Sequence, residues 1–410
     1  MHHTLDSHRK LISSMLTPVL ENLGPETLKV TDAQLAGRVT ATEVIARSPI
    51  PAFTNSQMDG FAVRSSDVAT ASEQHPVTLP LGFTAAAGAA PVTLAAGTAS
   101  PVMTGALLPA GADAVIPVEA SAAGAFQGLV RIGEGSPTGS VTFTNPVTPG
   151  TFVRPVGQDL EAGAVVAPAG TKITPTLIGA MVASGLNEVQ VLRQPRFLIC
   201  TTGDELGTAG AAAGQIPDSN SPMLATLLRG YGAIVQTAQL PDRPSLLEAA
   251  LMQFASQVDV IITIGGISAG AYEVVRQTLE PLGGSFHHVA MQPGGPQGHG
   301  LLGTTPVVCL PGNPVSAFLS LEVFIAPLLR TFAGLPEPTP RMLINRETVD
   351  SPESKHQIRR AQISGDTVKI LDPGSHLLHD LARADGLVHI PVGTSTLEAG
   401  ASIEVWSLDV

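Results

Sequence analysis

Five polar or glycine-rich segments in the middle of the chain carry the residues best suited to chemistry. They are TTGDEL (201–206), IPDSNS (216–221), LPDRP (240–244), GGISAG (265–270) and LPGNPVS (310–316). Backbone amides of the fourth segment, with the Ser268 hydroxyl, can form a concave site for an anion at a helix start. One helix terminus contributes only about 0.3 to 1 kcal/mol at an exposed site. Several such groups are therefore needed to hold a multiply charged ligand without a lysine.

Acidic side chains lie in or beside the same segments. They are Asp204, Glu205, Asp218, Asp242 and Glu273. Carboxylate oxygens are hard ligands that bind Mg²⁺ while the ion bridges phosphate groups. The segments together therefore predict a site for phosphate and a divalent cation. Each segment alone also has a structural interpretation: a tight turn after a strand for GGISAG, a solvated turn for GDEL, and a helix cap for Asn313.

The elements around these segments alternate between apolar strand-like runs and amphipathic helical runs. Each segment follows a strand such as RFLICTT or VDVIITI, or precedes a helix such as SPMLATLLRGYG. This alternation over residues 192–334 predicts a three-layer α/β domain with a mostly parallel sheet. Ligands bind such sheets beyond the carboxyl ends of the strands, so the five segments are expected to line one crevice.

The rest of the chain predicts three further domains, which makes the protein a multidomain α/β and β fold. Residues 9–48 are expected to be helical, with Thr31 and Asp32 as caps of a second helix, and to form an elongated linker domain with residues 153–191. A helix is expected to begin at Thr174 and Pro175. The short Val, Thr and Phe runs of residues 49–152 predict an inserted β-rich domain, and residues 335–410 predict a C-terminal β-barrel-like domain.

Composition narrows the function classes. A formal charge of −12 argues against nucleic acid and against a membrane surface as partners, since both are polyanions. We find neither a leader sequence nor an apolar span of about 20 residues, so the cytoplasm is the expected location. Cys200 and Cys309 lie in apolar runs and are expected to be buried and reduced.

Two other features need interpretation. The segments PAFTNSQMDGFAVR (51–64) and MTGALLPAGADAVIPVE (103–119) form a second cluster, in which Asp59-Gly60 is also a hairpin-turn signal. His287 and His288 are adjacent on an expected strand and point to opposite faces. A metal site shared by the two is therefore not expected, although one of them can face the crevice.

Taken together, these motifs resemble the molybdopterin molybdenumtransferase family, which includes MoeA and the E domain of gephyrin. PAFTNSQMDGFAV, the 103–119 segment, RPVGQDLEAG, TTGDEL, IPDSNS, IGGISAG and LPGNPVSA match that family in order and spacing. The resemblance covers about residues 9–408. It implies a homodimer of four-domain subunits, in which the 49–152 domain of one subunit faces the α/β domain of the other.

The resemblance also implies a reaction and its participants. Molybdate is inserted into adenylylated molybdopterin, and AMP leaves with the help of Mg²⁺. The substrates would be molybdate and adenylylated molybdopterin. Our own mechanistic hypothesis is that Asp242 and Glu273 hold the Mg²⁺. A molybdopterin adenylyltransferase and molybdoenzyme maturation proteins are candidate partners.

Position by position, the resemblance and the crevice argument predict two sets of site residues. The catalytic set is Asp59, Asp159, Glu205, Asp242 and Glu273. The substrate-binding set is Thr104, Gly203, Asp204, Asp218, Ser219, Asn220, Gly265, Gly266, Ser268, Gly270, Pro311, Gly312, Asn313, Pro314 and Ser316.

The chain departs from the family pattern at two places. The acid after the GGISAG loop is Glu273, where the family has an aspartate. The family's Lys-Pro-Gly-Lys-Pro becomes QPGGP (292–296), so Gln292 and Gly295 stand where lysines are expected. Loss of a charge-assisted hydrogen bond to phosphate costs about 1.5 to 3 kcal/mol. Candidate replacements for the charge are Arg229, Arg243 and Arg276.

These departures leave alternatives to an active transferase open. One is a diverged, non-catalytic relative that binds molybdopterin species or partner proteins as a carrier or scaffold. Another is a general nucleotide-binding protein, which would explain the α/β domain but not the TNSQMDGFAV segment.

Overall fold

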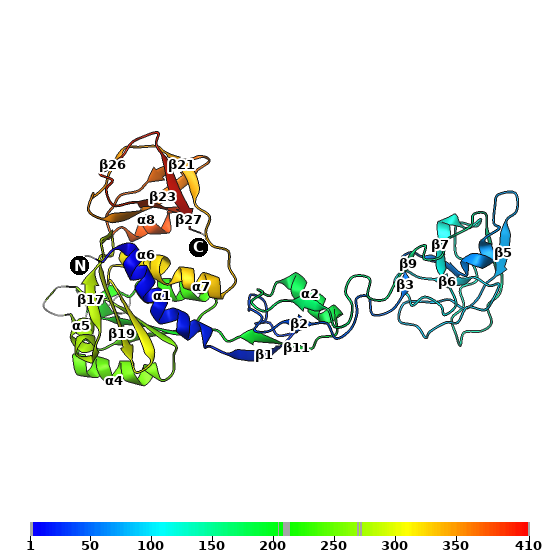
Figure 1. The fold of residues 1–410 in the computed structure, drawn as a ribbon, viewed down its shortest axis with the longest axis horizontal. Helices are drawn as coiled ribbons and strands as arrows, with labels where there is room; N and C mark the ends of the chain where they lie inside the picture. The colour runs from blue at the N-terminus through cyan, green and yellow to red at the C-terminus, as the bar shows by residue number, and fades with distance from the viewer. Residues whose placement is uncertain (1–2, 204, 208–213, 269, 271–272, 409–410) are drawn as a thin grey trace.

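The computed structural model describes residues 3–203, 205–207, 214–268, 270 and 273–408. The molecule is elongated (Figure 1). An α/β domain and a C-terminal β domain form the larger end, a narrow arm extends from them, and a small β-rich domain lies at the far tip.

A six-stranded sheet forms the centre of the α/β domain. Its strand order is β15 (Ile234–Leu240), β12 (Arg196–Thr202), β16 (Val260–Ile264), β20 (Thr305–Leu310), β19 (Pro296–Leu302) and β17 (Ser285–His288). The first four strands are parallel, whereas β19 is antiparallel to both of its neighbours. β17 therefore runs in the same direction as the parallel strands, and its C-terminal end lies at the same edge of the sheet as theirs.

Helices cover both faces of this sheet. Phe197 and Ile199 pack against α1 (Leu5–Glu21), α3 (Asn220–Gly230), α6 (Pro314–Phe324) and α7 (Ala326–Phe332). The alternate residues Leu198 and Cys200 pack against α4 (Pro244–Ala255) and α5 (Val274–Leu279). Successive strand residues point to opposite faces, so a strand buried on both sides is apolar throughout. The three-layer arrangement follows from this pattern.

Both cysteines are free and buried, as expected. Burial raises the pKa of Cys200 above its usual range and that of Cys309 to about 12. Neither thiol is therefore ionised near neutral pH, and both contribute to the core as small apolar groups.

The strand β19 was missed by the sequence analysis. Its glycines explain why, since they break the apolar alternation that marks a strand. A Cβ on Gly298 would overlap the ring of Phe286, and a Cβ on Gly300 would lie 3.3 Å from the Cα of Gly284. These glycines let β17 and the turn before it approach β19 closely, which is a tertiary requirement.

The apolar run after Pro314 forms two helices rather than one. The helix α6 ends at Phe324 and α7 begins at Ala326, at an angle of 44°. Pro327 explains the break, since it lacks an N–H and its ring disfavours the helical conformation of the preceding residue. By length and composition no single described helix could cross a membrane, and this bent pair is the only combination that passes the same test.

The prediction that residues 9–48 are helical is right only for α1. Residues 31–48 contain no helix: Asp32 accepts a hydrogen bond from the Gln34 amide, and Gly37 has a φ of +83°. Leu35 and Val44 pack instead in a small core with Ile173 and Met181. The helix α1 packs on α6 and α7 of the α/β domain, so its expected grouping with residues 153–191 is wrong.

The arm consists of short antiparallel pairs and one helix. The pairs are β1 (Pro25–Lys29) with β11 (Glu188–Leu192), and β2 (Val44–Ile45) with β10 (Val165–Ala167). The helix is α2 (Pro175–Ala183), and the Thr174 side chain caps it by accepting from the Leu177 amide at 3.2 Å. The helix start predicted at Thr174 and Pro175 is confirmed.

The distal β-rich domain is built from short strands around Phe61 and Phe143. The pairs are β4 (Gly60–Val63) with β6 (Ser100–Val102) and β7 (Ala114–Pro117), β5 (Val77–Pro80) with β8 (Ser140–Phe143), and β3 (Asn55–Ser56) with β9 (Val153–Arg154). Asp59-Gly60 does not form a hairpin, since β3 and β4 pair with different strands. A Cβ on Gly60 would overlap the Ile116 carbonyl, so close approach of β7 requires this glycine.

The C-terminal region contains a closed five-stranded barrel. Its strands follow the order β23 (His356–Ser364), β24 (Thr367–Ile370), β21 (Arg341–Asn345), β27 (Ser402–Ser407) and β25 (Gly386–Ile390). The barrel closes because β25 also pairs with β23. The expected barrel-like domain is confirmed, and β18 (Met291–Gln292) joins it to the α/β domain by pairing with β23. The other described strands are β13 (Leu206–Gly207), β14 (Ile216–Pro217), β22 (Val349–Asp350) and β26 (Thr396–Leu397), and the other described α-helix is α8 (Leu378–Ala382).

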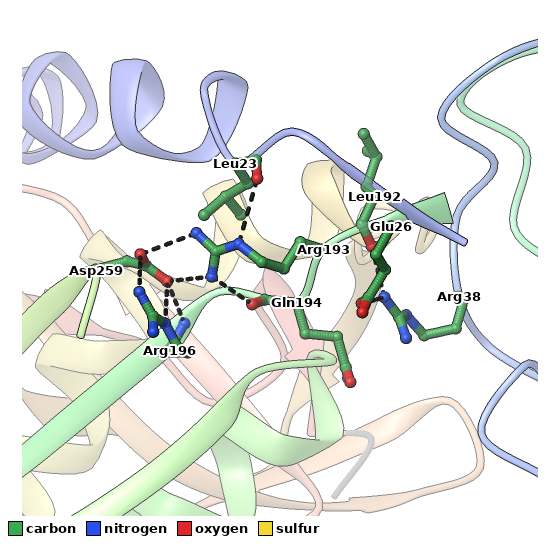
Figure 2. Close-up of polar contacts among 8 residues, drawn as sticks. All are labelled: Leu23, Glu26, Arg38, Leu192, Arg193, Gln194, Arg196 and Asp259. Carbon is green, nitrogen blue, oxygen red and sulfur yellow. Dashed lines mark hydrogen bonds and ion pairs between the residues drawn. The ribbon is translucent and has the colours of Figure 1, made fainter. Parts of the chain in front are cut away.

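A charged cluster joins the arm to the α/β domain (Figure 2). The Arg193 guanidinium donates to both carboxylate oxygens of Asp259, at 2.9 and 3.0 Å, and to the Leu23 carbonyl at 3.2 Å. Arg196 donates to the same carboxylate through its backbone and its side chain. Since Leu23 follows α1 and Arg193 follows β11, the cluster fixes the point at which the arm leaves the α/β domain.

Candidate functional site

A pocket of about 350 Å³ lies at the carboxyl edge of the parallel strands and brings together residues from all five segments. The lining consists of Thr201, Thr202, Gly203, Glu205, Leu206, Ile216, Pro217, Asp218, Ser219, Asn220, Asp242, Ile264, Gly265, Gly266, Ile267, Ser268, Glu273, Pro296, Pro311, Gly312 and Pro314. The strand order explains its position. The helix after β12 covers one face and the helix after β16 covers the other, so the sheet opens between these two neighbours.

Glycines form the floor of this pocket. Gly265 and Gly266 follow β16 with φ values of +88° and +63°, a conformation that favours glycine. A Cβ on Gly312 would lie 3.2 Å from the Cα of Gly265, so the loops after β16 and β20 touch through bare backbone. The floor therefore presents peptide groups to a ligand, with little side-chain bulk above them.

Two predicted substrate-binding residues act as helix caps. Asp218 accepts from the Ser221 amide at 3.0 Å and from the hydroxyls of Ser221 and Thr201. Asn313 accepts from the amides of Val315 and Ser316 at the start of α6. These contacts use the Ser221 amide of α3 and the Val315 and Ser316 amides of α6. Asn313 and Ser316 are not part of the pocket lining.

Asn220 links two sides of the pocket. Its Nδ2 donates to the Gly312 carbonyl at 2.8 Å, and its Oδ1 is buried without a hydrogen-bond partner in the structure. A buried acceptor without a partner has a free-energy cost. A ligand donor that reached this oxygen would remove that cost.

Four acidic side chains line the pocket: Asp218, which caps α3, and Glu205, Asp242 and Glu273. A Cβ on Gly203 would overlap the Glu205 carboxylate, and a Cβ on Gly270 would lie 2.8 Å from Oε1 of Glu273. Both carboxylates therefore fold back onto glycines of their own loops. Gly270 itself lies beside the lining, and the predicted site residue Asp204 lies outside the described residues.

The donor set fits Mg²⁺ only together with a ligand. Among the described residues, no three His, Cys, Asp or Glu side chains are arranged to hold a metal ion by themselves. Mg²⁺ is usually held by one or two carboxylates and by the phosphates of a substrate. Asp242 and Glu273 line the same pocket and meet that requirement.

Three predicted site residues lie elsewhere. Asp59 and Thr104 are in the distal domain, where Asp59 accepts hydrogen bonds from the Thr104 amide and hydroxyl, both at 2.7 Å. These two bonds lower the pKa of Asp59, although slight burial opposes them. Asp159 lies where the distal domain meets the arm, with its amide bonded to the Ile50 carbonyl. Within one chain, all three are separated from the pocket by the arm (Figure 1).

No Lys, Arg or His occurs among the described residues that line the pocket. Gln292 accepts from the Gln357 amide group and so faces the barrel. Of the arginines considered as replacements, Arg229 bonds to the Val235 carbonyl near the C-terminal end of α3, and Arg276 pairs with Glu280 at 2.7 Å. Arg243 is exposed beside Asp242. The pocket is thus acidic in its side chains.

Several lining residues were not among the predicted site residues, and Thr201 and Pro296 are two of them. The Thr201 hydroxyl donates to Asp218 at 2.9 Å and fixes the loop before α3. Pro296 lines the pocket from the start of β19. Thr201 lay within a motif that had been recognised, so its polar side chain at a strand end was an available signal. Pro296 had no comparable sequence signal, since the strand β19 that it begins was not predicted.

Comparisons with known proteins cover nearly the whole chain. Residues 3–185 match the family model described as MoeA N-terminal region (domain I and II), residues 198–331 match the probable molybdopterin binding domain, and residues 343–408 match the MoeA C-terminal region (domain IV).

Individual relatives agree with these family matches. Molybdopterin molybdenumtransferase 2 of Mycobacterium tuberculosis is 40% identical and covers 99% of each chain. Molybdopterin molybdenumtransferase of Synechococcus elongatus is 33% identical over 90% of this chain and 92% of its own. The crystal structure of a Pyrococcus molybdopterin biosynthesis MoeA protein superposes with a TM-score of 0.82, at 27% identity and 99% coverage of both chains.

Proposed function

The chain belongs to the molybdopterin molybdenumtransferase family, and we propose that it is a transferase that inserts molybdate into adenylylated molybdopterin and releases AMP with the help of Mg²⁺. The observation that supports this most directly is the pocket itself. Four carboxylates line the pocket beside its glycines, and no basic side chain occurs among the described lining residues. Such a pocket needs a cation to hold phosphate, and carboxylates with phosphate are the ligands that Mg²⁺ prefers.

Neutral donors on the floor would hold the phosphate oxygens. The amides of Gly266, Ile267 and Ser268 and the hydroxyl of Ser268 are the donors at hand. The Gly265 amide already donates to the Leu310 carbonyl, the Ser221 amide of α3 to Asp218, and the Val315 and Ser316 amides of α6 to Asn313. Donors fixed in place stabilise negative charge without reorganising. These groups would therefore bind the phosphate in place of Ser316, which was predicted to bind substrate but does not line the pocket.

Asp242 and Glu273 would hold the Mg²⁺. When bound, the ion neutralises charge on the pyrophosphate and makes AMP a better leaving group. Glu205 lies at the same pocket and can accept a hydrogen bond from a ligand hydroxyl or a water. The longer side chain of Glu273 folds back onto Gly270, which shortens its reach toward that of an aspartate.

A second copy of the chain would complete the site. The bonded pair Asp59 and Thr104 lies beyond the arm from the pocket of its own chain. In a homodimer, the distal domain of one subunit would face the α/β domain of the other, and both would contribute to the reaction. The cytoplasmic location and the candidate protein partners stay predictions.

AMP release from adenylylated molybdopterin by the purified protein tests the proposal, with molybdate and Mg²⁺ each added or omitted. Release that requires both would support the transferase. Tight binding without release, converted into release by Glu273→Asp, would favour a non-catalytic carrier. Binding of ATP as tightly as the pterin nucleotide would favour a general nucleotide-binding protein.

A further inference from the structure

His288 stands at the pocket edge of the sheet. It is the last residue of β17, and β17 runs in the same direction as the parallel strands. Its direct partner across the strands is Pro296, which lines the pocket. Residues paired across two strands share a face of the sheet, so the imidazole lies on the same side as the pocket-lining proline.

The face that carries His288 is also the face of the loop after β16. Phe286, two residues earlier on the same strand, packs against the core that includes α5. The neighbour His287 points to the opposite face, where its Nε2 lies 3.0 Å from Nδ1 of His8 in α1. The two histidines thus lie on opposite faces of the sheet, as predicted for adjacent strand residues. His288 lies on the face that also carries α5 and the loop with Glu273.

Because Gly295 has no side chain, the His288 ring can pack against its backbone. A Cβ built on Gly295 would overlap Cε1 and Nε2 of the His288 ring and would lie 3.1 Å from Nδ1. The imidazole therefore rests directly on the Gly295 backbone, in the volume that a side chain at position 295 would need. Within the described residues, its ring nitrogens have no recorded hydrogen-bond partner, and the residue is exposed.

The pocket needs such a group. Its described lining has four carboxylates near a floor of amides, and no Lys, Arg or His. A ligand oxyanion at the Pro296 side would meet a cationic side chain only from beyond the lining. An imidazole can donate an N–H to an oxyanion in its neutral form, and more strongly in its charged form.

We propose that His288, seated on Gly295, binds a tetrahedral oxyanion of the substrates at the Pro296 side of the pocket and replaces the lysine that the family pattern expects at position 295. The proposal deepens the proposed function and rests on it for the identity of the anion. Molybdate and a phosphate group share the required chemistry.

The three arginines are weaker candidates for this position. Arg229 lies near the opposite end of α3, and Arg276 is paired with Glu280 while its guanidinium lies over the Phe286 ring. Arg243 lies at the same sheet edge, but after β15, which is separated from β17 by four strands. Arg276→Gln and Arg243→Gln therefore serve as matched controls for loss of one positive charge.

The experiment titrates sodium molybdate and AMP separately into the intact protein in the presence of Mg²⁺, by calorimetry. The variants are His288→Gln, His288→Lys and the double variant His288→Ala with Gly295→Lys. We expect His288→Gln to weaken the binding of one of the two anions about tenfold or more, since the substitution removes a charge-assisted hydrogen bond. The two lysine variants should bind within about threefold of the parent.

The pattern of binding separates the sources of the oxyanion. Weakened molybdate with unchanged AMP assigns His288 to the metal oxyanion, and the reverse assigns it to the nucleotide phosphate. Binding of both anions within twofold of the parent in His288→Gln, or an equal loss in the arginine controls, would overturn the proposal. Failure of the proposed function would show differently, as a parent protein that releases no AMP with molybdate.

Discussion

Asn220 donates a hydrogen bond to the carbonyl oxygen of Gly312 at 2.8 Å, and this bond joins the first turn of α3 to the loop after β20. The second amide atom, Oδ1, is buried and has no hydrogen-bond partner among the residues that the structure describes. One side chain thus braces the pocket and leaves one acceptor for a ligand.

Replacing Asn220 tests this double role. Asn220→Ala should lower the rate of AMP release by about tenfold to a hundredfold and the free energy of unfolding by about 1 to 2 kcal/mol, since the Gly312 carbonyl loses its donor. Steady-state kinetics and thermal unfolding measure the two effects. Thr226→Ala, on an exposed part of the same helix, is the control. Equal activity of both variants would contradict a role for Asn220 in the pocket.

Glu273 should control the Mg²⁺ requirement. Glu273→Gln removes one of the two carboxylates proposed to hold the ion, so the Mg²⁺ concentration for half-maximal AMP release should rise at least about tenfold. Glu273→Asp should stay close to the parent, because the shorter acid is the family residue. Glu280→Gln, at an exposed ion pair after α5, is the control. An unchanged Mg²⁺ requirement in Glu273→Gln would remove Glu273 from the metal site.

Mixing two inactive variants tests whether two chains share a site. Asp59→Asn and Asp242→Asn should each lack activity alone. If subunits exchange freely, half of the dimers pair one of each, and each such dimer has one intact site, so the mixture should recover about a quarter of the parent activity. Unmixed samples at the same concentration are the control. No recovery after verified exchange would mean that Asp59 acts within its own chain or not at all.

Asp259 should stabilise the junction between the arm and the α/β domain. Burial raises its pKa, but hydrogen bonds from Arg193 and Arg196 outweigh this and hold the pKa below its usual value. The depressed pKa means that this stabilisation is present above the ordinary carboxyl pKa of about 4 and is lost as the pH falls below it.

Asp259→Asn should therefore lower the free energy of unfolding by about 1 to 3 kcal/mol at neutral pH. The difference from the parent should shrink under acid conditions, which denaturant unfolding at several pH values would measure. Asp6→Asn, at an exposed pair with Arg9 3.7 Å away, should change stability by less than about 1 kcal/mol. A pH-independent difference for Asp259→Asn would contradict the role of its charge.

Two histidines, His8 of α1 and His287 of β17, should make the stability of the protein sensitive to acid. Burial, and then repulsion from His287, His299 and His3, lower the pKa of His8 to about 3, and similar causes lower that of His287 to about 4. The folded state thus favours the neutral rings. Its stability is complete above the ordinary histidine pKa of about 6.5 and falls as the pH drops toward 4, because the unfolded chain binds more protons.

His8→Phe should reduce that loss by up to about 1.4 kcal/mol per pH unit below 6.5, since one buried imidazole is removed. Thermal unfolding from pH 7 to pH 4.5 measures the slope. His75→Phe, in an exposed turn of the distal domain, is the control. Identical slopes for His8→Phe and the parent would show that other groups cause the acid sensitivity.

Local sequence determined much of the fold. Apolar runs such as that of β12, and the Thr174-Pro175 start of α2, encode their elements through periodicity and hydrogen bonds between near neighbours. The alternation of strands and helices also predicted that five segments meet at one sheet edge, because parallel strands end at the same side. These inferences required no knowledge of distant contacts.

Only the tertiary structure decided what each residue at that edge does. Asp218 and Asn313 turned out to cap helices, and α1 packs on the α/β domain. His288 lies on Gly295 because β17 pairs with a strand, β19, whose glycines hid it from the sequence analysis. The physical reason is that a side chain's partners depend on packing between segments far apart in the chain, and residue type and spacing carry that information only in part.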